Sequence, residues 1–176
     1  MRLSIERKTT KIYPDLKRVV ARFFFNGEAR AKSIIQLVAA MSDQEVDITI
    51  MPILREFSRR HRNITRIFER HADRLRHLFP SLQIDYEGLS LKRKLLTGSF
   101  FTNEYSIESA AFFNPSLIED VDQSGLEEGQ KRVIMSFRAV GEGHVSSIAF
   151  RSGIIDRNNE IALIAPGNYV DEAEMI

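Results

Sequence analysis

Residues 102–153 read TNEYSIESAAFFNPSLIEDVDQSGLEEGQKRVIMSFRAVGEGHVSSIAFRSG. Short runs rich in β-branched and aromatic residues alternate here with turn residues, a pattern typical of consecutive strands. Together with the residues just beyond it, this stretch predicts strands over 110–118, 132–139, 145–155 and 160–165. The intervening turn clusters fall at 122–129, 141–143 and 156–159. Strands this close together in the chain are expected to form one antiparallel, meander-like sheet.

The chain before this stretch predicts an extended segment followed by helices. The run KRVVARFFF at 17–25 favours a strand, and apolar spacing predicts a helix over 28–41. Ser42 and Glu45 stand three residues apart, as a capping box requires, and predict the start of a second helix. Pro52 is expected to kink or break that helix because it lacks a backbone donor and clashes with the preceding turn.

Two more helices are predicted before residue 100. The third begins with Asn63 as its N-cap and ends at Pro80. Its apolar face consists of Ile64, Ile67, Phe68, His71, Leu75 and Leu78. The fourth spans 90–97, with Gly98 as its C-cap.

Composition limits the class of protein. The 176 residues are 43% hydrophobic and 28% charged, as in an ordinary globular protein of one domain, or of a small domain plus part of another. The sequence has no run of about 18 apolar residues, so it predicts no transmembrane helix. Its N-terminus lacks the apolar region of a secretory signal. The chain has no cysteine, which excludes disulfides and thiolate chemistry. We therefore expect a cytoplasmic location and no membrane partner.

Charge is divided unevenly along the chain. Residues 1–100 contain 20 Lys and Arg against 11 Asp and Glu, whereas residues 101–176 contain 5 against 13. Halves of opposite charge either attract each other or face different partners. We interpret them as two solvated faces within one protein, because charge runs on helices are usually solvent-exposed.

Asn114 and Arg138 are the polar residues that most suggest binding. Each closes an apolar run, in the sequences FFNPS and SFRA. An arginine at the end of a buried strand costs several kcal/mol unless it is paired, so such a residue usually holds an anion or a polar ligand. From spacing alone, the favoured interpretation is the ordinary one, in which Asn114 is a turn asparagine before Pro115 and Arg138 a surface arginine at a strand end. An amide and a forked guanidinium can together bind two neighbouring hydroxyl groups.

Long motifs around these two residues resemble glycoside hydrolase family 130, the mannoside phosphorylases and β-mannosidases. They are EYSIESAAFFNPS (104–116), DQSGL (122–126) and SFRAVGEGHVSSIAFRSG (136–153). The segments RKTTKIYPDLKRVVARFF (7–24) and REFSRRHRNITRIFERH (55–71) resemble the N-terminal extension of the longer members.

The resemblance implies an α+β fold in two parts. Residues 1–100 would form a strand and a helical extension, and residues 101–176 the first antiparallel blade of a five-bladed β-propeller. The implied reaction is phosphorolysis or hydrolysis of a β-mannoside with inversion. Inorganic phosphate would be the co-substrate of a phosphorylase, and no metal or other cofactor is implied.

The resemblance also implies which residues bind the sugar. Asn114 and Arg138 would line the pocket, and Ser116 and His144 are further candidates. In the family the catalytic aspartate lies in a later E-D-P-R type segment, so its counterpart is expected downstream of Ile176, the last residue of the sequence. We therefore expect an N-terminal piece of a longer protein that is inactive alone, is prone to self-association and assembles with the remaining blades.

Other charged residues suggest less specific chemistry. Glu104, Glu108 and Glu142 could form the acid/base pair of a glycosidase, but we interpret them as ordinary polar positions at the rim. The four histidines are scattered and predict no metal site. They are His61, His71, His77 and His144.

Two alternatives remain open. A nucleic-acid-binding module could use the Arg-rich segment 59–76, in which arginines recur every four residues at positions 62, 66, 70 and 74. Glu69 and Asp73 interrupt that row and no aromatic residue alternates with it, so we expect no nucleic-acid partner. The chain could also be a structural or interaction domain that joins a partner chain.

Overall fold

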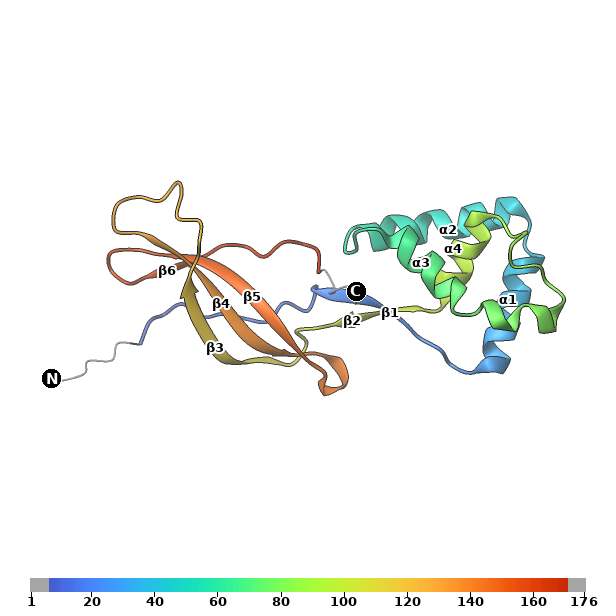
Figure 1. The fold of residues 1–176 in the computed structure, drawn as a ribbon, viewed down its shortest axis with the longest axis horizontal. Coiled ribbons are helices and arrows are strands. Elements are labelled where there is room, and N and C mark those ends of the chain that lie inside the picture. The colour runs from blue at the N-terminus through green and yellow to red at the C-terminus, as the bar shows by residue number, and fades with distance from the viewer. Residues whose placement is uncertain (1–6, 171–176) are drawn as a thin grey trace. The chain divides into compact units, whose positions relative to one another are not determined.

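The computed structural model describes residues 7–170 and divides them into two compact units (Figure 1). The sheet unit contains the described residues up to Arg18 together with Ser106–Gly167. The helical unit contains Val19–Tyr105 and the described residues from Asn168 onward. The predicted domain boundary at residue 100 lies near the return of the chain to the sheet unit. The segment before Arg18, which the sequence assigned to the first domain, groups with the sheet instead.

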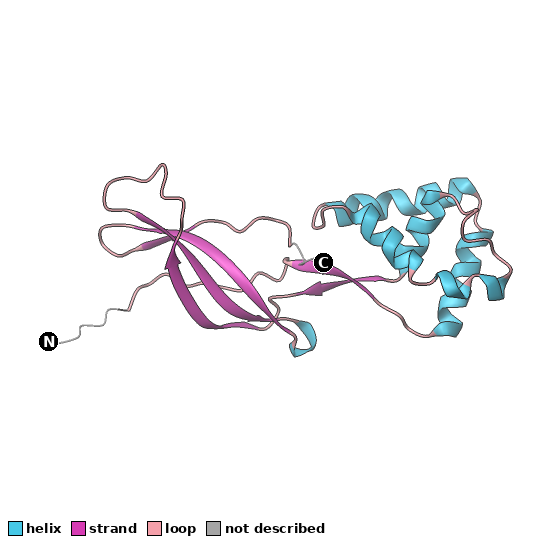
Figure 2. Ribbon diagram, in the orientation of Figure 1, coloured by secondary structure: helices cyan, strands magenta, loops and turns pink. Residues whose placement is uncertain are grey.

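The helical unit holds four α-helices and a two-stranded sheet in which β1 pairs with β2 (Figure 2). In chain order its elements are β1 (Val19–Phe23), α1 (Glu28–Ala40), α2 (Asp43–Ser58), α3 (Ile64–Asp73), the 3-10 helices η1 (Arg76–Leu78) and η2 (Pro80–Leu82), α4 (Leu91–Phe100) and β2 (Thr102–Ser106). Strand β2 was not predicted. Its sequence, TNEYS, has no apolar alternation to reveal it.

The first two helices begin where the sequence predicts. The capping box at the start of α2 is confirmed: the Glu45 amide donates to Ser42 Oγ over 3.3 Å, and Glu45 Oε2 accepts from the Ser42 amide over 2.7 Å. Of the two effects predicted for Pro52, a kink or a break, the break is wrong, because α2 continues through this residue. Pro52 and Ile48, one turn earlier, are both exposed, so water can solvate the carbonyl that loses its donor.

The third helix is shorter than predicted. Helix α3 ends at Asp73, and the 3-10 turns η1 and η2 carry the chain onward through Pro80. Asn63 occupies the N-cap position, but with a φ of 54° and no side-chain hydrogen bond, so it turns the backbone rather than capping it. The predicted apolar face is nevertheless the buried one, since Ile64, Phe68, His71, Leu75 and Leu78 are all buried.

Gly98 lies inside α4, so its predicted role as a C-cap is wrong. A Cβ atom at this position would lie 1.8 Å from the backbone oxygen of Phe68. Glycine is therefore required for α3 and α4 to pack this closely. Ser90 caps the start of α4 by accepting a hydrogen bond from the Arg93 amide over 3.4 Å.

The sheet unit is built on one four-stranded antiparallel meander, as the sequence predicts. The strands lie in the order β3 (Ala111–Glu119), β4 (Lys131–Val140), β5 (Ser146–Ile155) and β6 (Ile161–Leu163). The described residues contain a two-stranded and a four-stranded sheet and no closed barrel. Their helices include none that is long and apolar enough to cross a membrane.

The two faces of this sheet have different environments. The inner face is buried, with Val133, Met135, Phe137 and Ala139 on β4 beside Ala149 on β5. The outer face carries apolar side chains that remain exposed. They include Phe113 (49% exposed), Ile118 (61%), Ile148 (70%) and Phe150 (58%).

Candidate functional site

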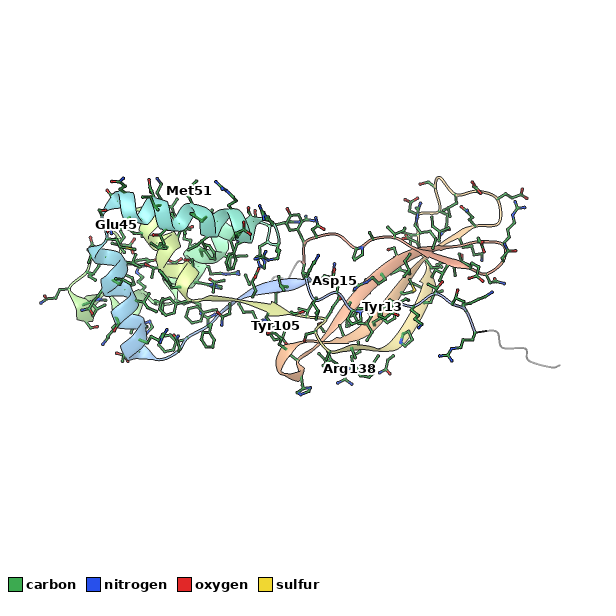
Figure 3. All side chains as sticks on the ribbon, turned by 180° about the vertical axis from the view of Figure 1, so that it is seen from behind. Tyr13, Asp15, Glu45, Met51, Tyr105 and Arg138 are labelled. Atoms are coloured by element: carbon green, nitrogen blue, oxygen red, sulfur yellow. The ribbon has the colours of Figure 1, made fainter. Side chains whose placement is uncertain are left out.

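Arg138 lies near the end of β4 with its side chain on the exposed outer face (Figure 3). Its Nε donates a hydrogen bond to Ser146 Oγ on β5 over 3.0 Å. Within residues 7–170, Arg138 has no carboxylate partner. The sequence argument from burial therefore does not apply to this residue. The buried arginine of the sheet is Arg151.

Asn114 lies at an irregularity in the neighbouring strand. The pairing of β3 with β4 shifts between Phe113 and Ser116, so Asn114 falls within a β-bulge. Its φ of 49° is left-handed, a conformation that asparagine tolerates better than most residues. Asn114 is exposed and lies outside the regular ladder, in the strand next to Arg138.

Ser116 and His144 lie close to the same part of the sheet. Ser116 directly opposes Ser136 on the outer face, one alternation along β4 from Arg138. His144 closes η3 (Glu142–His144), the short turn that joins β4 to β5, and has a φ of 60°. Both side chains are exposed. The four predicted binding residues therefore lie on β3, β4 and the β4–β5 turn, with Ser116 toward the middle of the sheet and the other three nearer that turn.

The catalytic aspartate implied by the resemblance has no counterpart among these residues. The resemblance implies a position downstream of Ile176, and Ile176 itself lies outside the residues that the structure describes. Its location therefore stays a prediction, and the site described here consists of candidate binding residues alone.

A buried ion cluster lies elsewhere in the sheet unit and centres on Glu108, which is fully buried. Its Oε1 accepts from Arg18 Nε over 2.8 Å, and its Oε2 accepts from the Asp15 amide over 2.9 Å and from Arg151 Nη2. The Arg151 guanidinium also lies 4.9 Å from the centre of the Phe112 ring. The interpretation of Glu108 as a rim position is wrong, because it ties the N-terminal segment to the sheet.

Glu104 occupies a second ion cluster, within the helical unit. Arg60 donates to both of its oxygens, over 2.6 and 3.0 Å, and His61 Nε2 lies 2.8 Å from Oε1. Burial alone would raise the pKa of Glu104, but the hydrogen bonds from Arg60 and His61 outweigh it and lower the pKa. A carboxylate held in this way is a structural anion rather than a proton donor.

His71 is buried and neutral. Thr102 Oγ1 donates to the Gly98 carbonyl over 2.8 Å, so it accepts from His71 Nδ1 at 2.7 Å, and this fixes the tautomer. Burial, aided by the charges of Arg70 and Arg74, lowers the pKa of His71 from 6.5 to about 4.

We expect this histidine to make the helical unit sensitive to acid. In the unfolded chain His71 gains a proton near pH 6.5, whereas in the folded chain it does so only near pH 4. The free energy of unfolding should therefore fall by about 3 kcal/mol between these values. Hydrogen exchange of the α3 amides at pH 7, 5.5 and 4 measures this. His71→Gln should remove this pH dependence of the free energy of unfolding, and the same change at the exposed His77 should not. Equal pH profiles for the two variants would contradict the assignment.

The arginine row at positions 62, 66, 70 and 74 makes contacts within its own unit. The Arg74 guanidinium lies 4.1 Å from the centre of the Phe23 ring, and that of Arg62 lies 5.1 Å from the Tyr169 ring. Asp73, which interrupts the row, accepts from Tyr86 over 2.6 Å. The row has no aromatic residue of its own, but two of its arginines lie over aromatic rings of other segments.

The described residues contain no group of three or more His, Cys, Asp or Glu side chains that could hold a metal ion. Comparison of the chain with known protein families, with curated proteins and with solved structures finds no match.

Proposed function

We propose that the sheet unit supplies part of the binding site for a β-mannoside, in a protein of the mannoside phosphorylase and β-mannosidase type. The observation that carries the proposal is the placement of Asn114 and Arg138. They lie on neighbouring strands, both are exposed, and Phe113, the residue before Asn114, directly opposes Arg138. An amide and a guanidinium in this arrangement offer several donors and one acceptor to the hydroxyl groups of a sugar.

The proposal includes the finer fold assignment, that β3–β6 form one blade of a β-propeller. A blade is a four-stranded antiparallel sheet whose faces pack on neighbouring blades. Two exposed apolar side chains of the outer face, Ile118 and Phe150, support this assignment, because such a surface is typical of a site that another protein surface covers. A cytoplasmic location is part of the same proposal.

The residues assigned here bind and orient the sugar, and the proposal names no catalytic residue among them. Of the three carboxylates considered for an acid/base pair, Glu104 and Glu108 each form ion pairs with arginine. In the proposed reaction phosphate or water attacks the sugar, and the acid catalyst for that step is not among these binding residues.

Titration of the full chain with β-mannobiose, followed by amide NMR, tests the proposal. We expect saturable shifts at the β3 bulge and at the β4–β5 turn. Arg138→Ala should weaken binding at least about tenfold, because losing a hydrogen-bond partner costs about 1–3 kcal/mol.

Arg157 provides the matched control. It is an exposed arginine in the β5–β6 turn of the same unit, where it pairs with Glu128. Arg157→Ala should leave the affinity unchanged. Equal affinities for the parent and Arg138→Ala would contradict the proposal, as would the absence of shifts at the bulge.

The alternative function of nucleic-acid binding through the Arg-rich segment 59–76 gains no support from the geometry. Arg60 is held by Glu104, Arg76 pairs with Glu87, and Arg62 and Arg74 lie over aromatic rings. These contacts compete with phosphate groups for the same guanidinium groups.

A further inference from the structure

Arg138 lies between two apolar residues on the outer face of the sheet. Phe113 on β3 and Ile148 on β5 both directly oppose it in the strand register. Side chains directly opposite each other on antiparallel strands lie about 5 Å apart at their Cβ atoms. Phe113 is 49% exposed and Ile148 is 70% exposed. The side chains of Phe113, Arg138 and Ile148 therefore start next to one another across three strands, and the Arg138 guanidinium reaches along β5 to Ser146.

Ser146 fixes one side of the guanidinium. Its hydroxyl accepts from Arg138 Nε over 3.0 Å, and it lies on the same face as Arg138, next to the β4–β5 turn. Among the described residues, the terminal nitrogens of Arg138 have no hydrogen-bond partner. These nitrogens form a planar fork that matches two acceptors at once. The hydrogen bond to Ser146 thus leaves the fork available while restricting its orientation.

We propose that Phe113 is the stacking platform of this site and that Ser146 is the positioning residue for Arg138. The inference rests on the proposed function and extends it to the residues that place the sugar: the ligand lays one apolar face on the ring and two neighbouring hydroxyls on the guanidinium. The face of an aromatic ring is electron-rich, so it attracts the slightly positive C–H bonds of a sugar. Sugar sites that combine an apolar wall with a few polar groups fix both position and orientation.

Phe150 is the control that distinguishes stacking on a sugar from packing of an apolar surface. It lies on the same outer face and is 58% exposed, but it opposes Ser136 rather than Arg138. If the outer face were only a surface for packing another sheet, Phe113 and Phe150 would be equivalent. If Phe113 stacks on a sugar, only Phe113 should affect binding.

The experiment titrates the full chain with β-mannobiose and compares Phe113→Leu with Phe150→Leu. Both changes remove an exposed ring and keep an apolar side chain, and amide spectra establish that each variant is folded. We expect Phe113→Leu to weaken binding about three- to tenfold, as the loss of a stacking contact does. Phe150→Leu should leave the affinity within about twofold. Phe113→Tyr should restore it, and the upfield ring-current shift of the ligand C–H protons should vanish only in Phe113→Leu.

The role of Ser146 has its own readout. In Ser146→Ala the Arg138 Nε–H resonance should shift and exchange faster with water, and the affinity should fall. The same change at Ser152, further along β5 on the same face, should alter neither. An unchanged Nε–H resonance in Ser146→Ala would overturn the positioning role.

The outcomes distinguish this inference from the proposed function. If the parent binds and Arg138→Ala does not, but Phe113→Leu behaves like Phe150→Leu, the stacking role is overturned and the proposed function stands. If the parent does not bind β-mannobiose, or if its binding is independent of Arg138, the proposed function fails and the inference fails with it.

Discussion

Replacing Glu108 by alanine is expected to lower the free energy of unfolding of the sheet unit by about 3–5 kcal/mol. Glu108 is fully buried, and two arginines depend on it: the side chain of Arg18 is 15% exposed and that of Arg151 only 5%. Removing the carboxylate leaves both positive charges desolvated without a counter-charge. The cost of that state, rather than the strength of the ion pair itself, makes the expected effect large.

Hydrogen exchange of the β4 and β5 amides measures this loss, because it reports on one unit of the chain at a time. Glu119 is the control, since it also pairs with a basic residue, Lys131, but on the surface. Glu119→Ala should change the free energy of unfolding by less than about 1 kcal/mol. A loss below about 1 kcal/mol in Glu108→Ala would show that the two arginines find other partners or water.

Phe68→Ala is expected to destabilise the helical unit by about 3–5 kcal/mol. The Phe68 side chain is fully buried among residues of α1, α2 and α4, and its ring meets Phe57 edge-on at 5.3 Å. Because the close contact at Gly98 holds the α3 and α4 backbones in place, the helices cannot collapse into the cavity.

Exchange of the α3 amides again measures the effect, and Phe24 provides a matched residue. Phe24 is 48% exposed, so Phe24→Ala should cost less than about 1 kcal/mol. If the two substitutions had similar effects, Phe68 would not be a core residue and the packing described for α3 would be wrong.

The strands of the sheet could be predicted from the sequence because their signals are local. Apolar runs and turn clusters alternate between β3 and β6, and each run is long enough to define a strand. The capping box at Ser42 is equally local. Gly98 and Pro52 were misinterpreted because their effects depend on neighbours that are distant in the sequence or on exposure to water. Gly98 reads as a helix end, and only the position of Phe68 shows that it is a crossing point.

The candidate site shows the same division. Asn114 and Arg138 were selected by residue type and resemblance, and the antiparallel pairing of β3 and β4 places them on neighbouring strands. Phe113 and Ser146 were not selected from the sequence, because their proposed roles depend on the strand register and on one hydrogen bond across strands. The Glu108 cluster was also missed. Its partner Arg18 is 90 residues away, and no local pattern pairs them.

The chain leaves and re-enters the sheet unit at neighbouring points. The amide of Ile107 donates to the carbonyl of Arg18 over 3.1 Å, so a backbone hydrogen bond joins the two ends of the intervening segment, residues 19–106. An insertion whose ends lie this close imposes little strain on its host. A short turn that joins Arg18 directly to Ile107 is therefore expected to replace residues 19–106 without disturbing the strands of the sheet.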